Sequence, residues 1–146
     1  MSMKKEQLSA AVPVQCEPPK AGRRYTCSVE AALDVIGGKW KGIMVFHLLT
    51  GSPRRFNEFR RLMPMITQRM LTLQLRELEQ DGIVHREVYR EVPPRVEYSL
   101  TPFGLTLKPI ILQVWEWGKT YEARLAEQEQ ALSPNALNSA RSESNQ

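Results

Sequence analysis

The hydrophobic pattern changes its period at Gly82, and this change restricts the fold more strongly than any other feature of the sequence. Before this glycine, the segment TQRMLTLQLRELEQDG (67–82) repeats apolar residues at helical spacing. After it, residues 83–90 and 95–100 are rich in Val and Tyr, and Glu91-Val92-Pro93-Pro94 supplies a turn between them. The chain must therefore place a small antiparallel hairpin against a group of helices.

Three more helices are predicted before residue 67, with a short extended strand at residues 54–56 between the second and the third, and one long helix follows the hairpin. The first helix has Ser28 as its cap, the third has Asn57 and the fourth has Thr67. The last helix opens at Thr101-Pro102, and Pro109 either kinks it or delays its start. This order is typical of a mainly helical (α+β) winged helix-turn-helix, in which the second helix of a pair enters the DNA major groove.

The length of 146 residues and the hydrophobic content of 42% suit one core of ordinary size. Both ends of the chain lack apolar periodicity and are rich in residues such as Pro, Ser, Gln and Glu. Such segments cannot bury enough surface to offset their chain entropy. We therefore expect one domain at about 23–129, with flexible tails at 1–22 and 130–146.

Several classes of protein are excluded by the absence of their motifs. The sequence has neither the apolar run of a signal peptide nor a segment as long as a membrane span, so we expect a cytoplasmic protein without membrane contact. No Gly-rich phosphate loop, nucleophile elbow or HExxH motif occurs, and the two His and two Cys lack zinc-binding spacing. We expect no enzymatic activity, no catalytic residue, no metal and no cofactor.

Positive charge is concentrated in the first two thirds of the chain. Residues 20–95 hold 14 Lys and Arg against 8 Asp and Glu, whereas residues 96–146 hold 4 against 6. An anionic partner would be met by the basic part. An ordinary solvated surface explains the charge equally well. The spacing of individual residues therefore has to show whether the basic part binds an anionic partner.

The predicted helix at 67–82 has two faces, because successive residues are 100° apart. Leu71, Leu75 and Leu78 cluster on one face. The opposite face carries four residues at positions i, i+3, i+4 and i+7, with Gln68 at its edge; they are Arg69, Thr72, Leu73 and Arg76. Arg can bind guanine, Gln can bind adenine, and the methyl groups of Thr or Leu can touch the thymine methyl. An isolated helix with this pattern also fits a core helix with a solvated side.

Cations lie near this helix on both sides. Arg60 and Arg61 on the preceding helix, together with the N–H groups of a capped helix N-terminus, can bind phosphates and fix the register on DNA. Arg90 and Arg95 flank the hairpin turn, and arginines on a narrow ribbon can enter a minor groove. The alternative for these two is cross-strand pairing with Glu91 or Glu97.

Three segments together resemble a known family. They are CSVEAALDVIGGKW, RRFNEFRRLMPMITQRMLTLQLRELEQDGIV and PPRVEYSLTPFGLTL, and a helix with tryptophans follows them. The sequence is similar to the HxlR-type transcriptional regulators, relatives of MarR, over about residues 25–125. The resemblance implies a homodimer of winged-helix subunits, joined through the first and last helices, that binds double-stranded operator DNA.

The resemblance also implies which residues contact DNA. The sequence departs from the family pattern at Ser28, where relatives usually have proline, and at Leu73, which is often polar in relatives. Operator preference therefore does not transfer from relatives to this chain. The implied base-reading residues are Thr67, Gln68, Arg69, Thr72, Leu73 and Arg76, and the implied wing is Arg90 to Arg95.

The predicted last helix carries more apolar surface than a single small core covers, which indicates an interface. We assign Ile111 and Trp115 to the interface of the homodimer. The alternative is a helical protein-interaction module, in which Trp115 and Trp117 mark the surface for a different partner.

Cys27 directly precedes the first helix, and Arg23 and Arg24 come just before it. A helix N-terminus and nearby cations both favour a thiolate. Some members of the resembled family sense oxidants, quinones or aldehydes through a cysteine at this position, which implies a redox or electrophile switch near the dimer interface. Cys16 is then a candidate resolving thiol for a disulfide between subunits. The alternative is a small buried residue without a signalling role.

The sequence thus predicts a sequence-specific DNA-binding transcriptional regulator, acting as a homodimeric repressor that responds to an oxidant or electrophile through Cys27. Two alternatives stay open at this point. One is the helical protein-interaction module, and the other is a regulator that answers a small molecule without thiol chemistry.

Overall fold

The computed structural model describes residues 24–133. The predicted tail at 1–22, with Cys16, lies outside the described residues, and so do residues 134–146 of the predicted C-terminal tail. The last helix continues to Leu132, past the predicted end of the domain at residue 129.

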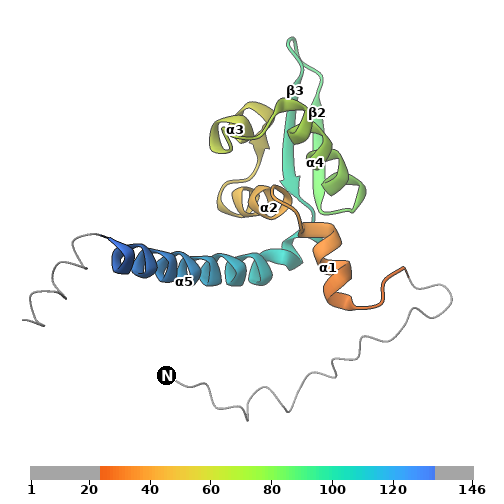
Figure 1. Cartoon of the computed structure of the whole chain (residues 1–146). Coiled ribbons are helices and arrows are strands. Elements are labelled where there is room, and N and C mark those ends of the chain that lie inside the picture. Colours follow the sequence, from red (N-terminus) through yellow and green to blue (C-terminus); the bar gives the residue numbers. More distant parts are fainter. Residues whose placement is uncertain (1–23, 134–146) are drawn as a thin grey trace, which may run out of the picture.

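The elements follow one another in the predicted order, with one short 3-10 helix in addition (Figure 1). The strands form an antiparallel sheet in the order β1-β3-β2. The elements are α1 (Ser28–Ile36), α2 (Lys41–Thr50), β1 (Arg54–Arg55), α3 (Phe56–Leu62), α4 (Gln68–Gln80), β2 (Val84–Tyr89), β3 (Arg95–Leu100), η1 (Gly104–Leu107) and α5 (Lys108–Leu132).

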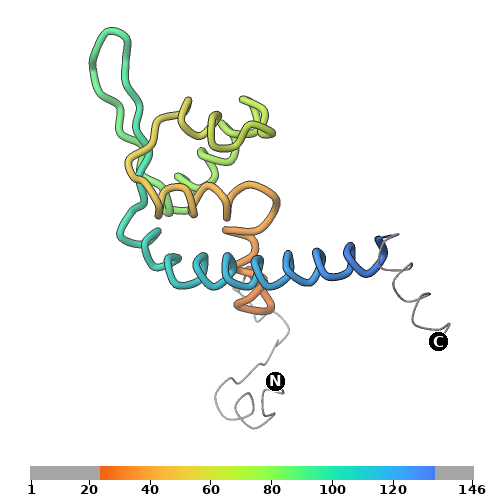
Figure 2. The backbone as a smooth tube through the Cα atoms, turned by 90° about the vertical axis from the view of Figure 1, so that its left-hand side faces the viewer, coloured from red at the N-terminus to blue at the C-terminus, as the bar shows by residue number. Residues whose placement is uncertain are grey.

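The molecule has two distinct ends, which both overall views show. The hairpin of β2 and β3 projects at the top of Figures 1 and 2, and α3 and α4 lie beside it above α2. Helices α1 and α5 lie at the bottom, and α5 runs well beyond the rest of the fold. Helix α2 therefore lies between two ends of the fold. One end carries α3, α4 and the hairpin, which were predicted to contact DNA, and the other end carries α1 and α5.

Helix α4 forms as predicted from the sequence. Thr67 is its N-cap, and its hydroxyl oxygen accepts a hydrogen bond from the Met70 N–H at 3.1 Å. The helix ends at Gln80. Gly82 follows with a φ of 74°, a backbone angle that residues with a side chain rarely adopt. Three leucines of one face are buried, which confirms the predicted apolar face; they are Leu71, Leu75 and Leu78.

The sheet has a third strand, which the sequence predicted as a short strand without indicating its partner. Arg54 and Arg55 form this strand and pair with Tyr98 and Glu97 of β3. The Tyr98 ring lies edge-on to the buried ring of Phe59, with 6.3 Å between the ring centroids. A strand of two residues shows no period of its own, so the sequence does not indicate which strand it pairs with.

The starts of two helices differ from the prediction. Ser28 and Asn57 were the expected caps, but α1 begins at Ser28 itself and α3 begins at Phe56. In both helices a glutamate of the first turn supplies the acceptor instead of the preceding side chain. Glu30 accepts from the Thr26 N–H at 3.0 Å, and Glu58 accepts from the Arg55 N–H at 3.3 Å.

The start of the last helix also differs from the prediction. The Thr101 hydroxyl accepts from the Gly104 N–H at 2.9 Å, at the start of the short helix η1, but the N-cap residue of η1 is Phe103 and Thr101 does not cap the last helix. Helix α5 starts at Lys108, with Pro109 as its second residue. A proline in the first turn loses no helical hydrogen bond, so Pro109 delays the helix rather than kinking it.

The two faces of α4 give a matched pair of substitutions. Leu71→Ala should lower the free energy of unfolding by about 2–5 kcal/mol, because Leu71 is fully buried and its loss leaves a cavity. Leu73→Ala should change it by less than about 1 kcal/mol, because Leu73 is 43% exposed. Urea unfolding at one protein concentration measures both, and equal losses would contradict this assignment of faces.

Candidate nucleic-acid interface

The exposed face of α4 presents one continuous surface. The side chains of five residues line a single open hollow along this helix; they are Gln68, Arg69, Thr72, Leu73 and Arg76. Arg69 and Arg76 form no ion pair with any residue that the structure describes, so their guanidinium groups face solvent. The leucines of the opposite face are buried in the core, so this surface is directed toward solvent. The structure thus brings together five of the six residues predicted to read bases.

Two threonines of this region already use their hydroxyl groups within the protein. Thr67 caps α4, and the Thr72 hydroxyl donates to the carbonyl oxygen of Gln68 at 2.9 Å. That bond fixes the Thr72 side chain, so its methyl group is the part available to a thymine methyl. Thr67 has an established role as a cap, and its contact with DNA stays a prediction.

Helix α3 presents cations next to α4. Arg60 and Arg61 are exposed, and neither forms an ion pair within residues 24–133. Asn57 and both arginines line a second open hollow, together with Pro64 and Ile66 in the segment that leads to α4. Two uncompensated guanidinium groups beside the N-terminus of α4 suit a phosphate group.

The two arginines of the hairpin differ in their surroundings. Arg95 lies 3.4 Å from Glu91 and 3.6 Å from Glu97, and its guanidinium carbon lies 4.1 Å from the centre of the Tyr89 ring. It therefore pairs with the two glutamates named in the alternative for this residue, although not across the strands, because Glu97 lies on β3 itself and Glu91 lies between β2 and β3. Arg90 is exposed and has no ion pair among the described residues. Of these two arginines, Arg90 is thus the one that remains available to an external anion.

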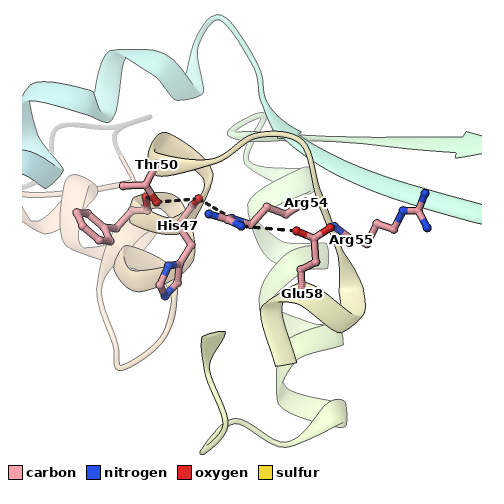
Figure 3. Close-up of polar contacts among 6 residues, drawn as sticks. His47, Thr50, Arg54, Arg55 and Glu58 are labelled. Carbon is pink, nitrogen blue, oxygen red and sulfur yellow. Dashed lines mark hydrogen bonds and ion pairs between the residues drawn. The ribbon is translucent and has the colours of Figure 1, made fainter. Parts of the chain in front are cut away.

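Arg54 links the end of α2 to α3, a role that the sequence analysis did not assign (Figure 3). Its Nε donates to the carbonyl oxygen of His47 at 2.8 Å, and its terminal nitrogen lies 3.6 Å from Glu58. Burial, followed by the charge of Arg54, lowers the pKa of His47 below its ordinary value. The neighbouring Arg55 side chain points away from this group.

Cys27 occupies the N-cap position of α1 and is half-buried. Glu30 lies in the first turn, where it accepts from both the N–H and the hydroxyl of Thr26. These hydrogen bonds lower the pKa of Glu30, so a negative charge sits at this helix N-terminus. A carboxylate there opposes the formation of a nearby thiolate. This repulsion acts against the effect of the helix N-terminus, on which the sequence-based prediction relied.

Helices α1 and α5 expose apolar side chains on the far side of the fold. Helix α1 has no buried residue, and Val29 and Leu33 are 63% and 59% exposed. Trp115 is 46% exposed and stacks on Phe46 of α2. Ile111, the other predicted interface residue, is only 4% exposed because it packs into the core of its own subunit. Further exposed residues of α5 are Val114, Trp117, Tyr121 and Leu125.

Among residues 24–133, no group of three or more His, Cys, Asp or Glu side chains is placed to hold a metal ion. No helix in that part of the chain has both the length and the apolar character needed to cross a membrane.

The sequence profile described as HxlR-like helix-turn-helix matches residues 35–126, which include α2 to α4, the hairpin and most of α5. The chain belongs to this family. YdeP of Bacillus subtilis (strain 168), an HTH-type transcriptional regulator, is 64% identical over 105 residues, which span 72% of this chain and 81% of YdeP. An HTH-type regulator of Methanothermobacter thermautotrophicus is 56% identical over 97 residues, spanning 66% of this chain and 73% of that protein. This HxlR-like chain is a transcriptional regulator of the helix-turn-helix type, and its relatives are not enzymes.

Solved structures of related regulators share the fold. The redox regulator HypR in its reduced form is 67% identical with a TM-score of 0.65, covering 68% of this chain and 98% of that chain. The reduced form of the transcriptional regulator YodB from B. subtilis is 37% identical with a TM-score of 0.57, covering 64% and 91%. The predicted winged-helix fold of this HxlR-like chain is therefore confirmed.

Arg54 and Arg55 allow a test of what holds α3 in place. Arg54→Met should lower the free energy of unfolding by about 1.5–3 kcal/mol, because a charged hydrogen bond to the His47 carbonyl is lost. Arg55→Met is the matched control and should change it by less than about 0.5 kcal/mol, because that side chain is exposed. Chemical denaturation followed by circular dichroism measures both values. Similar values for the two variants would show that Arg54 does not support α3.

Proposed function

We propose that this protein is a repressor that reads operator DNA with the exposed face of α4. The observation that carries the proposal is the single surface shared by Gln68, Arg69, Thr72, Leu73 and Arg76, held outward by buried leucines. Its donors and methyl groups match the groups that base edges present in the major groove. The family also supports this function, because its members are helix-turn-helix regulators.

Phosphate contacts would set the position of this helix on the duplex. Arg60 and Arg61 on α3 and Arg90 on the hairpin lack ion pairs with described residues, so binding a phosphate breaks no existing pair. Arg95 is different, because DNA would have to compete with Glu91 and Glu97 for its guanidinium group. Its contribution to affinity is therefore expected to be the smallest among these arginines.

We further propose that α1 and α5 join two copies of the chain. Helix α5 has 25 residues and buries only Ile111 within its own subunit, and α1 buries no residue at all. Apolar surface on two neighbouring elements favours a self-complementary interface with twofold symmetry. Trp115 would lie within this interface, whereas Ile111 would pack behind it in the core of its own subunit. A twofold dimer also presents two α4 helices to the two halves of a palindromic operator.

Cys27 is the proposed site of regulation by an oxidant or electrophile. An oxidant such as diamide would take two electrons and two protons from Cys27 and a second thiol, leaving a disulfide, and Cys16 is the candidate for that thiol. A quinone would instead add directly to the sulfur of Cys27. The thiol lies at the start of α1, one of the proposed dimer helices. The likeness to HypR, whose reduced and oxidised forms are both known, supports this proposal.

Substitution of single arginines tests the division between base reading and phosphate binding. Arg76→Ala should reduce the discrimination between operator and random DNA by about 1–3 kcal/mol, because a base contact is lost. Arg60→Ala should weaken both DNAs alike and make binding less dependent on salt. Gel shifts with the DNA upstream of the protein's own gene, in the presence of competitor DNA and at several salt concentrations, measure these effects. Equal losses on both DNAs for Arg76→Ala would contradict its assignment to base reading.

Replacement of the cysteines one at a time tests the regulatory site. Diamide should release wild-type protein from operator DNA, whereas Cys27→Ser should remain bound, because it has no thiol at this position. Cys16→Ser is the matched variant, since it should lose the response to diamide but keep the response to a quinone. Release of Cys27→Ser by either reagent would favour a regulator that does not use this thiol.

A further inference from the structure

A half-buried ion pair connects α4 to α2. The Nζ of Lys41 lies 2.7 Å from the Oε2 of Glu77, and the two side chains are 11% and 38% exposed. Among the ion pairs between described residues, this one joins α4 to another element, whereas those of Arg54 and Arg95 lie elsewhere. Nothing in the sequence analysis pointed to it.

The position of Lys41 explains why it needs this partner. Lys41 is the first residue of α2, whose first turn contains no acidic residue. The positive end of the helix dipole disfavours a cation there, and the low exposure of the side chain limits its hydration. Glu77 supplies the missing negative charge from α4. The carboxylate is therefore held at one point relative to α2.

Glu77 follows directly after Arg76, the residue proposed to read a base. The leucines behind α4 fix which face is buried, but apolar contacts have no preferred direction and allow a helix to slide or rotate slightly. A charge-assisted hydrogen bond does have a preferred direction and length. The pair can thus fix the rotation of α4 more narrowly than the leucines alone.

The other end of this connection is also anchored. Helix α2 buries Met44, Val45 and Leu48 in the core. Its Phe46 stacks on Trp115 of α5, with 6.1 Å between the ring centroids. Lys41 therefore extends from a helix that is held by the core and by α5.

From this arrangement we infer that Lys41 and Glu77 are positioning residues for operator recognition, holding α4 at the rotation in which its exposed face meets the bases. The inference rests on the proposed reading of DNA by α4. It assigns neither residue a contact with DNA. Its consequence is that loss of the pair lowers discrimination between DNA sequences, while attraction to DNA in general persists.

A double-mutant cycle tests the inference. Lys41→Met and Glu77→Gln should each lower the ratio of operator to random-DNA affinity by about tenfold, which lies within the range for coupled contacts. The double variant should lose no more than either single variant, because the same pair is already broken. The ratio of the two affinities is the proper readout, because a change in the net charge of the protein alters its affinity for operator and random DNA alike. Additive losses or an unchanged ratio would overturn the inference.

Glu79→Gln is the matched control. Glu79 lies on the same helix, is exposed and forms no ion pair with a described residue. Its substitution removes the same charge as Glu77→Gln and should leave the ratio unchanged. A loss of discrimination as large as that of Glu77→Gln would mean that charge near the DNA, rather than the pair, sets the ratio, and would overturn the inference.

Two further measurements keep the test decisive. If a single variant does not fold, the double variant Lys41→Met with Glu77→Leu replaces the pair by apolar groups and should fold with a reduced ratio. If wild-type protein does not discriminate between operator and random DNA, the proposed function fails. Hydrogen exchange then tests independently whether the Lys41–Glu77 pair holds α4 in place. Amides of α4 should exchange faster in Glu77→Gln than in Glu79→Gln, and equal rates would overturn the inference.

Discussion

Burial of the three leucines of α4 is the constraint on which the remaining structure depends. Leu71, Leu75 and Leu78 lie on one side of the helix and are almost completely removed from water. Because a helix is rigid, burying one side fixes the direction of the opposite side. Arg69 and Arg76 are thereby directed to solvent without any contact of their own. The stability of the core and the availability of the reading surface thus have the same physical origin.

Electrostatic pairing decides which cations of the fold remain available to an anion. The arginines of α3 and of the α4 surface have no carboxylate partner in the described part of the chain, whereas Arg95 is shared between two glutamates. Lys41 and Arg54 are also engaged, in contacts that hold helices together. The basic residues therefore divide into structural and accessible groups. Net charge alone does not reveal this division.

Cys27 lies in a local field that is more balanced than the sequence indicated. The helix N-terminus favours a thiolate, but Glu30 brings a carboxylate to the same turn through its hydrogen bonds with Thr26. Such a balance would restrain the reactivity of a thiol toward weak electrophiles. It also makes the first turn of α1 a place where a single substitution changes the local charge.

The sequence by itself determined the order of the elements, the two faces of α4 and the set of residues on its exposed surface. It could do so because the period of apolar residues records which side of one element is buried. Only the tertiary structure decided the partner of the short strand at Arg54, the burial of Ile111, the pairing of Arg95 and the contact between Lys41 and Glu77. Each of these joins residues through the placement of separate elements or through side-chain geometry, and no local period encodes such a relation.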